Sequence, residues 1–173
     1  DGDTGICGPG VGELREAIYS QRDATFRGAE FQSQLDVAPV WHGWWGIENQ
    51  LDVVRATFRD GTNVPRIPPM RVGGGLFYRD DAWLAKINLL HAFAQDDIAP
   101  IGETPTAGYN DLRAEISYRW VPAQVRPGEI KEVTVGLRGT NLLNADIRNS
   151  VSYTKDEVLL PGLSVRMFTS VKF

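Results

Sequence analysis

An alternation of apolar and polar residues runs through the last dozen positions of this chain. Leu163, Val165, Met167 and most odd positions after them are apolar, whereas the even positions between them are mostly polar. Successive side chains of a β-strand point to opposite faces of a sheet, so this pattern predicts a strand with one apolar and one polar face. The same period of two recurs along the chain, and no segment carries a sustained helical stripe.

The alternating segments predict seven strands. They are residues 14–38, 41–58, 67–80, 83–95, 107–120, 131–142 and 162–173. Each has about 11 residues or more, the span that a tilted strand needs to cross a bilayer, whereas strands of soluble sandwiches commonly have about five to six. The predicted fold class is therefore all-β, an antiparallel up-and-down transmembrane β-barrel.

The predicted connections alternate in length. The short or middle-length ones are 38–40, 80–82 and 121–130, and the longer ones, rich in Asp, Asn, Gly and Pro, are 59–66, 96–106 and 144–161. Short turns at one rim and long loops at the other are typical of outer-membrane barrels, whose short side is periplasmic and whose long side is extracellular.

All five tryptophans fall at the rim with the short turns, and Tyr78 lies beside them. They are Trp41, Trp44, Trp45, Trp83 and Trp120. Indole rings prefer the interface between membrane and water because the ring is apolar and its N–H needs a partner. The clustering predicts a periplasmic aromatic girdle, since a buried core would scatter its tryptophans along the strands.

If the apolar face meets lipid, the polar face must line a wet interior, with its interspersed charges paired across neighbouring strands. A soluble antiparallel sheet with its charged face in water would show the same alternation, so this alternative stays open. Seven is an odd number, and single-chain bacterial barrels normally have an even one. We therefore interpret the chain, which starts without Met, as a piece whose remaining strands lie elsewhere.

Composition excludes several other classes of protein. The formal net charge is −4 and the basic residues are scattered, which argues against a nucleic-acid partner. There is no run of 18 apolar residues, and from the opening residues we expect no export signal within this stretch. The single Cys7 excludes an internal disulfide framework. No nucleophile elbow, HExxH or paired-cysteine motif occurs, so we expect neither enzymatic activity nor a cofactor.

Several motifs follow one another along the chain: Ala24–Glu30, Pro65–Pro69, Glu103–Tyr109, Gly139–Asn149, Pro161-Gly162 and a last strand that ends in Phe173. Their order and spacing together resemble those of TonB-dependent outer-membrane receptors, and Gly139–Asn149 resembles the penultimate-strand signature of that family. Leu163 and Ile147 depart from residues that are commoner in the family.

The resemblance implies a 22-stranded barrel, of which residues 14–173 would be the final seven strands and residues 1–13 the remnant of an extracellular loop. The plug domain and the TonB-binding segment would lie outside this chain. The implied partners are outer-membrane lipid, the remaining strands, the plug, the TonB complex and the barrel-assembly machinery, which would read Phe173. The implied activity is import of a scarce nutrient across the Gram-negative outer membrane. A metal-siderophore is the commonest ligand, and zinc, haem, cobalamin or a glycan are others.

Candidate ligand-binding residues are few. Asp96, Asp97 and Glu103 lie on a predicted extracellular loop and could contact a cationic or metal-bound ligand, although loop carboxylates are usually only solvated. His42 and His91 are predicted too far apart to share a metal, so no metal site is expected. The run Gly73–Gly75 reads as a bend or a close approach to a neighbouring strand.

Two other functions remain open at this stage. A soluble β-sandwich binding module should stay monomeric without detergent. A passive porin-type channel should conduct without any TonB requirement.

Overall fold

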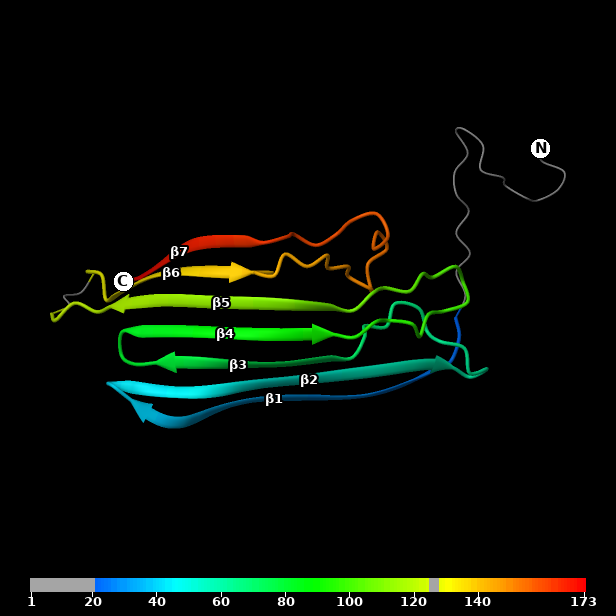
Figure 1. Cartoon of the computed structure of the whole chain (residues 1–173), viewed down its shortest axis with the longest axis horizontal. Helices are drawn as coiled ribbons and strands as arrows, with labels where there is room; N and C mark the ends of the chain where they lie inside the picture. The colour runs from blue at the N-terminus through cyan, green and yellow to red at the C-terminus, as the bar shows by residue number, and fades with distance from the viewer. Residues whose placement is uncertain (1–20, 125–127) are drawn as a thin grey trace, which may run out of the picture.

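The computed structural model describes residues 21–124 and 128–173, and these residues form one antiparallel sheet of seven strands in chain order (Figure 1). The strands are β1 Ala24–Val40, β2 Gly43–Phe58, β3 Arg71–Arg79, β4 Trp83–Ala92, β5 Tyr109–Trp120, β6 Glu132–Thr140 and β7 Ser164–Lys172. Within this part of the chain no helix could span a membrane. The predicted seven up-and-down antiparallel strands are confirmed.

The predicted boundaries of the first strand were wrong. Positions 14–20 lie outside the described residues, positions 21–23 are not strand, and β1 continues past residue 38 to Val40. A register shift between Asp36 and Ala38 marks a bulge near this end, and such an irregularity blurs the alternation on which the prediction rested. Within the described residues the sheet is open, with β1 and β7 as its two edges.

The two ends of the sheet differ. The connections β1–β2, β3–β4 and β5–β6 lie at one end, with the C-terminus, and the longer connections lie at the other (Figure 1). We call these the turn end and the loop end. The strands β1 and β2 have 17 and 16 residues, and their pairing runs about six residues further toward the loop end than the pairing of β2 with β3.

The strand register sorts the side chains into two opposite faces. One row of paired residues crosses all seven strands and is entirely apolar or glycine: Leu35, Ile47, Leu76, Ile87, Ala114, Gly139 and Val165. The next row toward the turn end points to the other side and is mostly charged: Asp36, Gly46, Phe77, Lys86, Glu115, Arg138 and Arg166. We call these sides the apolar face and the polar face.

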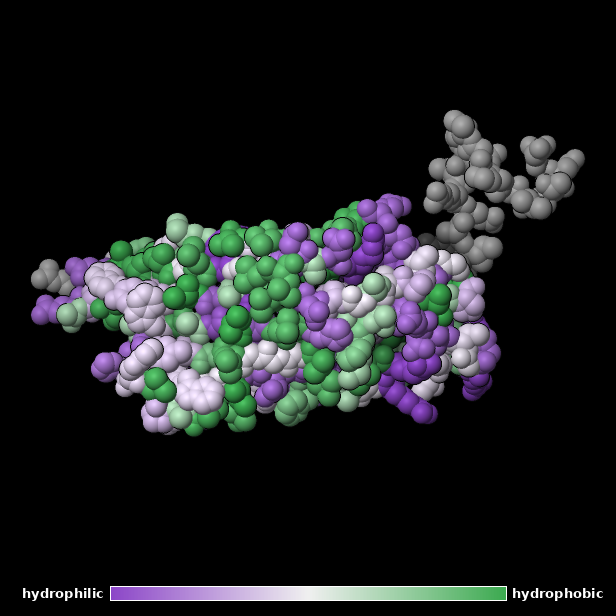
Figure 2. All heavy atoms as spheres, viewed as in Figure 1, coloured by the Kyte–Doolittle hydropathy of each residue, from purple (hydrophilic) through white to green (hydrophobic). Residues whose placement is uncertain are grey.

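Nothing among the described residues covers the apolar face. The buried hydrophobic side chains are few and mostly small: Ala56, Phe77, Ala92, Ala99 and Ile147. Large side chains of the apolar face are exposed instead, such as Leu76 at 54% and Met167 at 73%. Figure 2 shows hydrophobic atoms spread over the strands and hydrophilic atoms gathered at the loop end. If this surface stayed in water, the folded chain would not gain the free energy of burying it, and apolar burial is the main driving force of folding.

Glycines on the polar face let side chains from the neighbouring strand lie flat on the sheet. The ring of Phe77 covers Gly46, the amide of Asn88 covers Gly75, and the ring of Phe168 covers Gly136. Of the run Gly73–Gly75, the interpretation as a close approach is confirmed at Gly75, where a Cβ would stand 2.1 Å from the Asn88 amide nitrogen, and not at Gly74, where the nearest atom would be 3.6 Å away.

We expect Gly46→Ala to lower the free energy of unfolding by about 1–3 kcal/mol, the usual cost of overpacking. The added Cβ would stand 2.2 Å from Cζ of Phe77 and 2.3 Å from the carbonyl oxygen of Leu35, so both the ring and the backbone would have to move. Gly74→Ala is the matched control, because its nearest neighbour would be 3.6 Å away. Denaturant unfolding of the two variants compares them, and equal losses of stability would contradict this packing.

Candidate functional site

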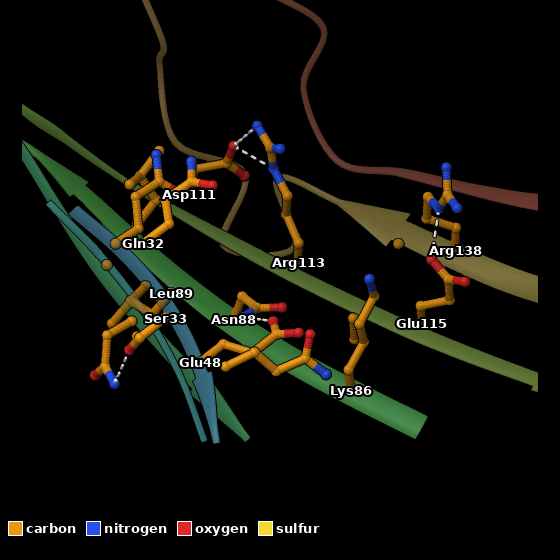
Figure 3. Close-up of a pocket in the computed structure, with 18 residues that line it drawn as sticks. Gln32, Ser33, Glu48, Lys86, Asn88, Leu89, Asp111, Arg113, Glu115 and Arg138 are labelled. Carbon is orange, nitrogen blue, oxygen red and sulfur yellow. Dashed lines mark hydrogen bonds and ion pairs between the residues drawn. The ribbon is translucent and has the colours of Figure 1, made fainter. Parts of the chain in front are cut away.

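The polar face contains a hollow of about 630 Å³. Its lining comes from six successive strands, β1 to β6, and includes glutamine and asparagine amides, three carboxylates and three cations. Figure 3 shows these side chains standing on the curved sheet. Gly73 of β3 contributes to the hollow because, on the polar face, it adds no side chain to fill it.

Charges on the polar face are paired between strands, as the sequence predicted. Arg71 donates to Asp52 over 2.8 Å, Arg79 to Asp36 over 2.6 Å, and Arg138 to Glu115 over 2.8 Å. Glu48 accepts a hydrogen bond of 2.7 Å from the Asn88 amide. A pair of exposed ions contributes little to stability, so the chief effect of this network is to fix where each charge lies.

A latch at the loop end of β5 and β6 explains part of the segment Gly139–Asn149. The buried Asn141 adopts a left-handed backbone with φ of 48°, which asparagine tolerates better than most residues. Its side chain accepts from the amide of Ala145 and donates to the carbonyls of Ala145 and Pro161, while its own amide donates to Asp111. The motif therefore has a structural role in this chain, closing one turn and tying the next loop to β5.

A cluster that we call the loop clasp joins the three connections at the loop end, residues 59–70, 93–108 and 141–163. It is formed by Arg66, Glu103, Thr104, Lys155 and Asp156. The Glu103 carboxylate accepts from the backbone amides of Arg66 and Ala99, over 2.9 and 2.8 Å. The ammonium of Lys155 lies 3.6 Å from the same carboxylate and donates to the carbonyl of Thr104. The Thr104 hydroxyl donates to Asp156 over 2.7 Å.

The clasp also buries an ion pair. The side chains of Lys155 and Glu103 are only 5% and 9% exposed. The guanidinium of Arg66 stacks on the ring of Tyr153, 3.4 Å from its centroid, and donates to the carbonyl of Val151. The loops of residues 93–108 and 141–163 are therefore held together in this structure.

The three predicted ligand-binding carboxylates have different surroundings. Glu103 is engaged within the clasp, and Asp97 forms an ion pair with Arg55 of β2. Asp96 is exposed on the same loop. Whether any of them binds a ligand stays a prediction, and of the three Asp96 is the one with an open surface and no ion pair within the described residues.

Sequence reasoning missed Lys155 and Arg66, because a loop has no periodicity that distinguishes a buried lysine from a solvated one. The histidines lie at opposite ends of the sheet: His42 is in the β1–β2 turn, and His91 lies near the loop end of β4, where Nδ1 is 2.9 Å from Asn110. Within the described residues no group of three or more His, Cys, Asp or Glu could hold a metal ion. Cys7 and the expected loop of residues 1–13 lie outside this part of the chain.

All five tryptophans lie at the turn end. Trp41 is in the β1–β2 turn with its ring 5.7 Å from that of Tyr78, and Trp83 packs at 4.9 Å against Tyr118. Trp44 lies on the polar face, because its register partner is Arg79. Trp45, Trp83 and Trp120 lie on the apolar face. A location at a membrane interface stays a prediction for the whole set.

Asp80 organises the β3–β4 turn. Its carboxylate accepts from the Tyr78 hydroxyl over 2.7 Å and from the backbone amides of Ala82 and Trp83 over 2.7 and 2.6 Å. These bonds, the Tyr78 hydroxyl first, lower the pKa of Asp80 below its ordinary value of 3.8, with a smaller contribution from His42.

We expect the Asp80 turn to stay intact at neutral pH and to loosen only in strong acid. Because the folded pKa is lowered, the carboxylate stabilises the turn fully above 3.8, and this contribution is lost as the pH falls through the folded pKa below that value. NMR titration of the Asp80 carboxyl carbon measures the pKa directly. Tyr78→Phe should move it upward, and a midpoint at or above 3.8 in the unchanged chain would contradict the geometry.

Comparison with known proteins adds no assignment to these observations. No family model matches the chain, and no curated protein matches it.

Proposed function

We propose that this chain is the C-terminal wall of a TonB-dependent outer-membrane transporter that imports a scarce nutrient. Its apolar face would contact lipid, its polar face would line the interior of a closed barrel, and β1 and β7 would pair with strands supplied from elsewhere. The turn end would face the periplasm and the loop end the exterior.

One observation carries this proposal: a seven-stranded sheet with an uncovered apolar face on one side and a paired, charged face on the other. A soluble sandwich needs a second layer over its apolar face, and the described residues supply none. Strands β3 to β7 have 9 to 12 residues, close to the length of about 9–11 that crosses a bilayer at a tilt. The aromatic turn end and the tied loops at the opposite end also fit an outer-membrane barrel.

The transport activity rests on the resemblance of the motifs, and a TonB test addresses it. A bacterium that lacks its own ferric-siderophore receptors would express the full-length protein, and uptake of a panel of labelled ferric siderophores, haem, cobalamin and zinc would be measured with and without functional TonB. We expect saturable uptake of at least one ligand that disappears when TonB is removed. Conductance through planar bilayers without TonB would instead favour the passive channel, and a protein that stays soluble without detergent would favour the sandwich.

A further inference from the structure

In the ion pairs of the polar face, the carboxylate side chain is less exposed to solvent than its cationic partner. Asp111 is 7% exposed and its partner Arg113 59%, while Glu115 is 9% exposed and its partner Arg138 56%. The same order holds for the pairs of Asp36, Asp52 and Glu132 on this face. The surface that the hollow offers to a solute is therefore richer in positive charge than the composition of its wall suggests.

Three cations stand in the hollow on adjacent strands. Lys86 of β4 is paired in register with Glu115 of β5, which is paired in turn with Arg138 of β6, and Arg113 lies two residues before Glu115. Neighbouring strands are about 4.8 Å apart and residues two apart in a strand are separated by about 6.7 Å, so the three side chains start within about 10 Å of one another. Figure 3 shows Lys86, Arg113 and Arg138 pointing in the same direction from the sheet.

These cations have hydrogen-bond donors left over. Arg113 uses Nε and one Nη on Asp111, and Arg138 uses Nε on Glu115. Lys86 has no hydrogen-bond or ion-pair partner among residues 21–124 and 128–173, because Arg138 engages the carboxylate opposite it. A guanidinium carries five N–H donors and an ammonium three, so most of the donors in the group have no hydrogen-bond partner among the described residues.

The two arginines are held in place from below. The Asp111 carboxylate that anchors Arg113 is itself fixed by the backbone amide of Asn141, over 3.1 Å. The guanidinium of Arg138 lies over the ring of Phe168, 5.3 Å from its centroid, and that ring rests on Gly136. Donors that are fixed before a ligand arrives lose less entropy on binding. The two arginines are therefore preorganised to bind a carboxylate or phosphate group.

We propose that this hollow binds a small anionic molecule through its carboxylate or phosphate groups, with Lys86, Arg113 and Arg138 as the contacts. The volume of about 630 Å³ lies within the usual range for small-molecule sites, about 300–1,000 Å³. The amides of Gln32, Gln34 and Gln50 line the same hollow and suit hydroxyl groups on such a ligand. The inference deepens the proposed function, on which it rests, by naming an anionic class of solute.

The test measures binding of citrate and of inorganic phosphate to the full-length protein in detergent by isothermal titration calorimetry. Lys86→Met is the informative variant, because it removes the cation without leaving a wall carboxylate unpaired, whereas truncating either arginine would strip Asp111 or Glu115 of its partner. We expect Lys86→Met to weaken citrate binding about tenfold or more, as loss of one charged contact does, and Lys86→Arg to restore most of it. Trimethyl citrate, which is neutral, should not bind.

The matched control is Arg166→Gln, which removes one charge from the same face. Arg166 has no partner among the described residues and does not line the hollow, so citrate binding should be unchanged. Absence of citrate and phosphate binding in the unchanged protein, equal affinity in Lys86→Met, or an equal loss in Arg166→Gln would each overturn the proposal. TonB-dependent uptake that persists alongside such a result would leave the transport function standing and remove only the anion site.

Discussion

If the apolar face contacts lipid as proposed, Leu137→Arg is expected to lower the free energy of unfolding of the protein in lipid vesicles by about 2–4 kcal/mol. Leu137 lies in the middle of β6 on the apolar face, between Ile116 and Met167 of the adjacent strands. An arginine at the centre of a lipid-facing barrel surface costs this much because its charge must leave water. Reversible unfolding in urea from lipid vesicles, followed by tryptophan fluorescence, gives the difference.

The same substitution distinguishes a sheet whose apolar face contacts lipid from a soluble sheet. Leu137 is 48% exposed, so in water the arginine would reach solvent and the cost should be within about 0.5 kcal/mol. Ser170→Arg, on the polar face of the adjacent strand β7 and opposite Thr134, is the control and should cost little in either case. A negligible effect of Leu137→Arg in vesicles would contradict contact of this face with hydrocarbon.

Lys155→Met is expected to release the loop clasp, with a local loss of about 3–5 kcal/mol, the usual consequence of removing one partner of a buried ion pair. Glu103 would keep its two backbone donors but remain as an uncompensated buried charge, and the carbonyl of Thr104 would lose its donor. Hydrogen exchange should then speed up together in residues 93–108 and 141–163. The sheet itself should keep its protection.

A second variant identifies the cause. Glu103→Gln added to Lys155→Met removes the unpaired charge. Arg66 and Ala99 donate to different oxygens of the Glu103 carboxylate, so the single oxygen of glutamine keeps one of these two hydrogen bonds, and only part of the lost protection should return. Lys131→Met is the control, because the side chain of that lysine is exposed at the turn end and, among the described residues, bonds only the carbonyl of Phe173. Exchange that changes in one loop alone would show that the clasp does not couple the two.

The strands were predictable from sequence because the period of two reports directly on which side each residue faces. The row from Leu35 to Val165 has an apolar residue or glycine in every strand. Pairing of the strands therefore aligns the apolar positions of each strand into one continuous face. The start of β1 was not predicted in this way, since the expected strand was extended across Gln21, Arg22 and Asp23, which are not apolar and form no strand. The bulge beside Asp36 likewise left no distinct signal in the sequence.

The site was less accessible to sequence reasoning because it depends on contacts between distant segments. Glu103 was selected as a loop carboxylate, but its partner Lys155 lies 52 residues further along and only the fold brings them together. The unpaired state of Lys86 follows from competition, since Arg138 engages the Glu115 that the register also places beside Lys86. Alternation assigns Lys86, Glu115 and Arg138 to the polar face, but it cannot say which donor the Glu115 carboxylate will bind.

The most direct test of the account follows spin labels along β7, placed one at a time from Val165 to Val171 in protein whose Cys7 is replaced by serine. The labels are read in lipid vesicles by their collisions with oxygen, which concentrates in hydrocarbon, and with a nickel chelate, which stays in water. We predict a period of two, with Val165, Met167 and Thr169 open to oxygen, and Arg166 and Ser170 open to the chelate. Apolar positions shielded from both reagents, as in a dry core between two sheets, would contradict it.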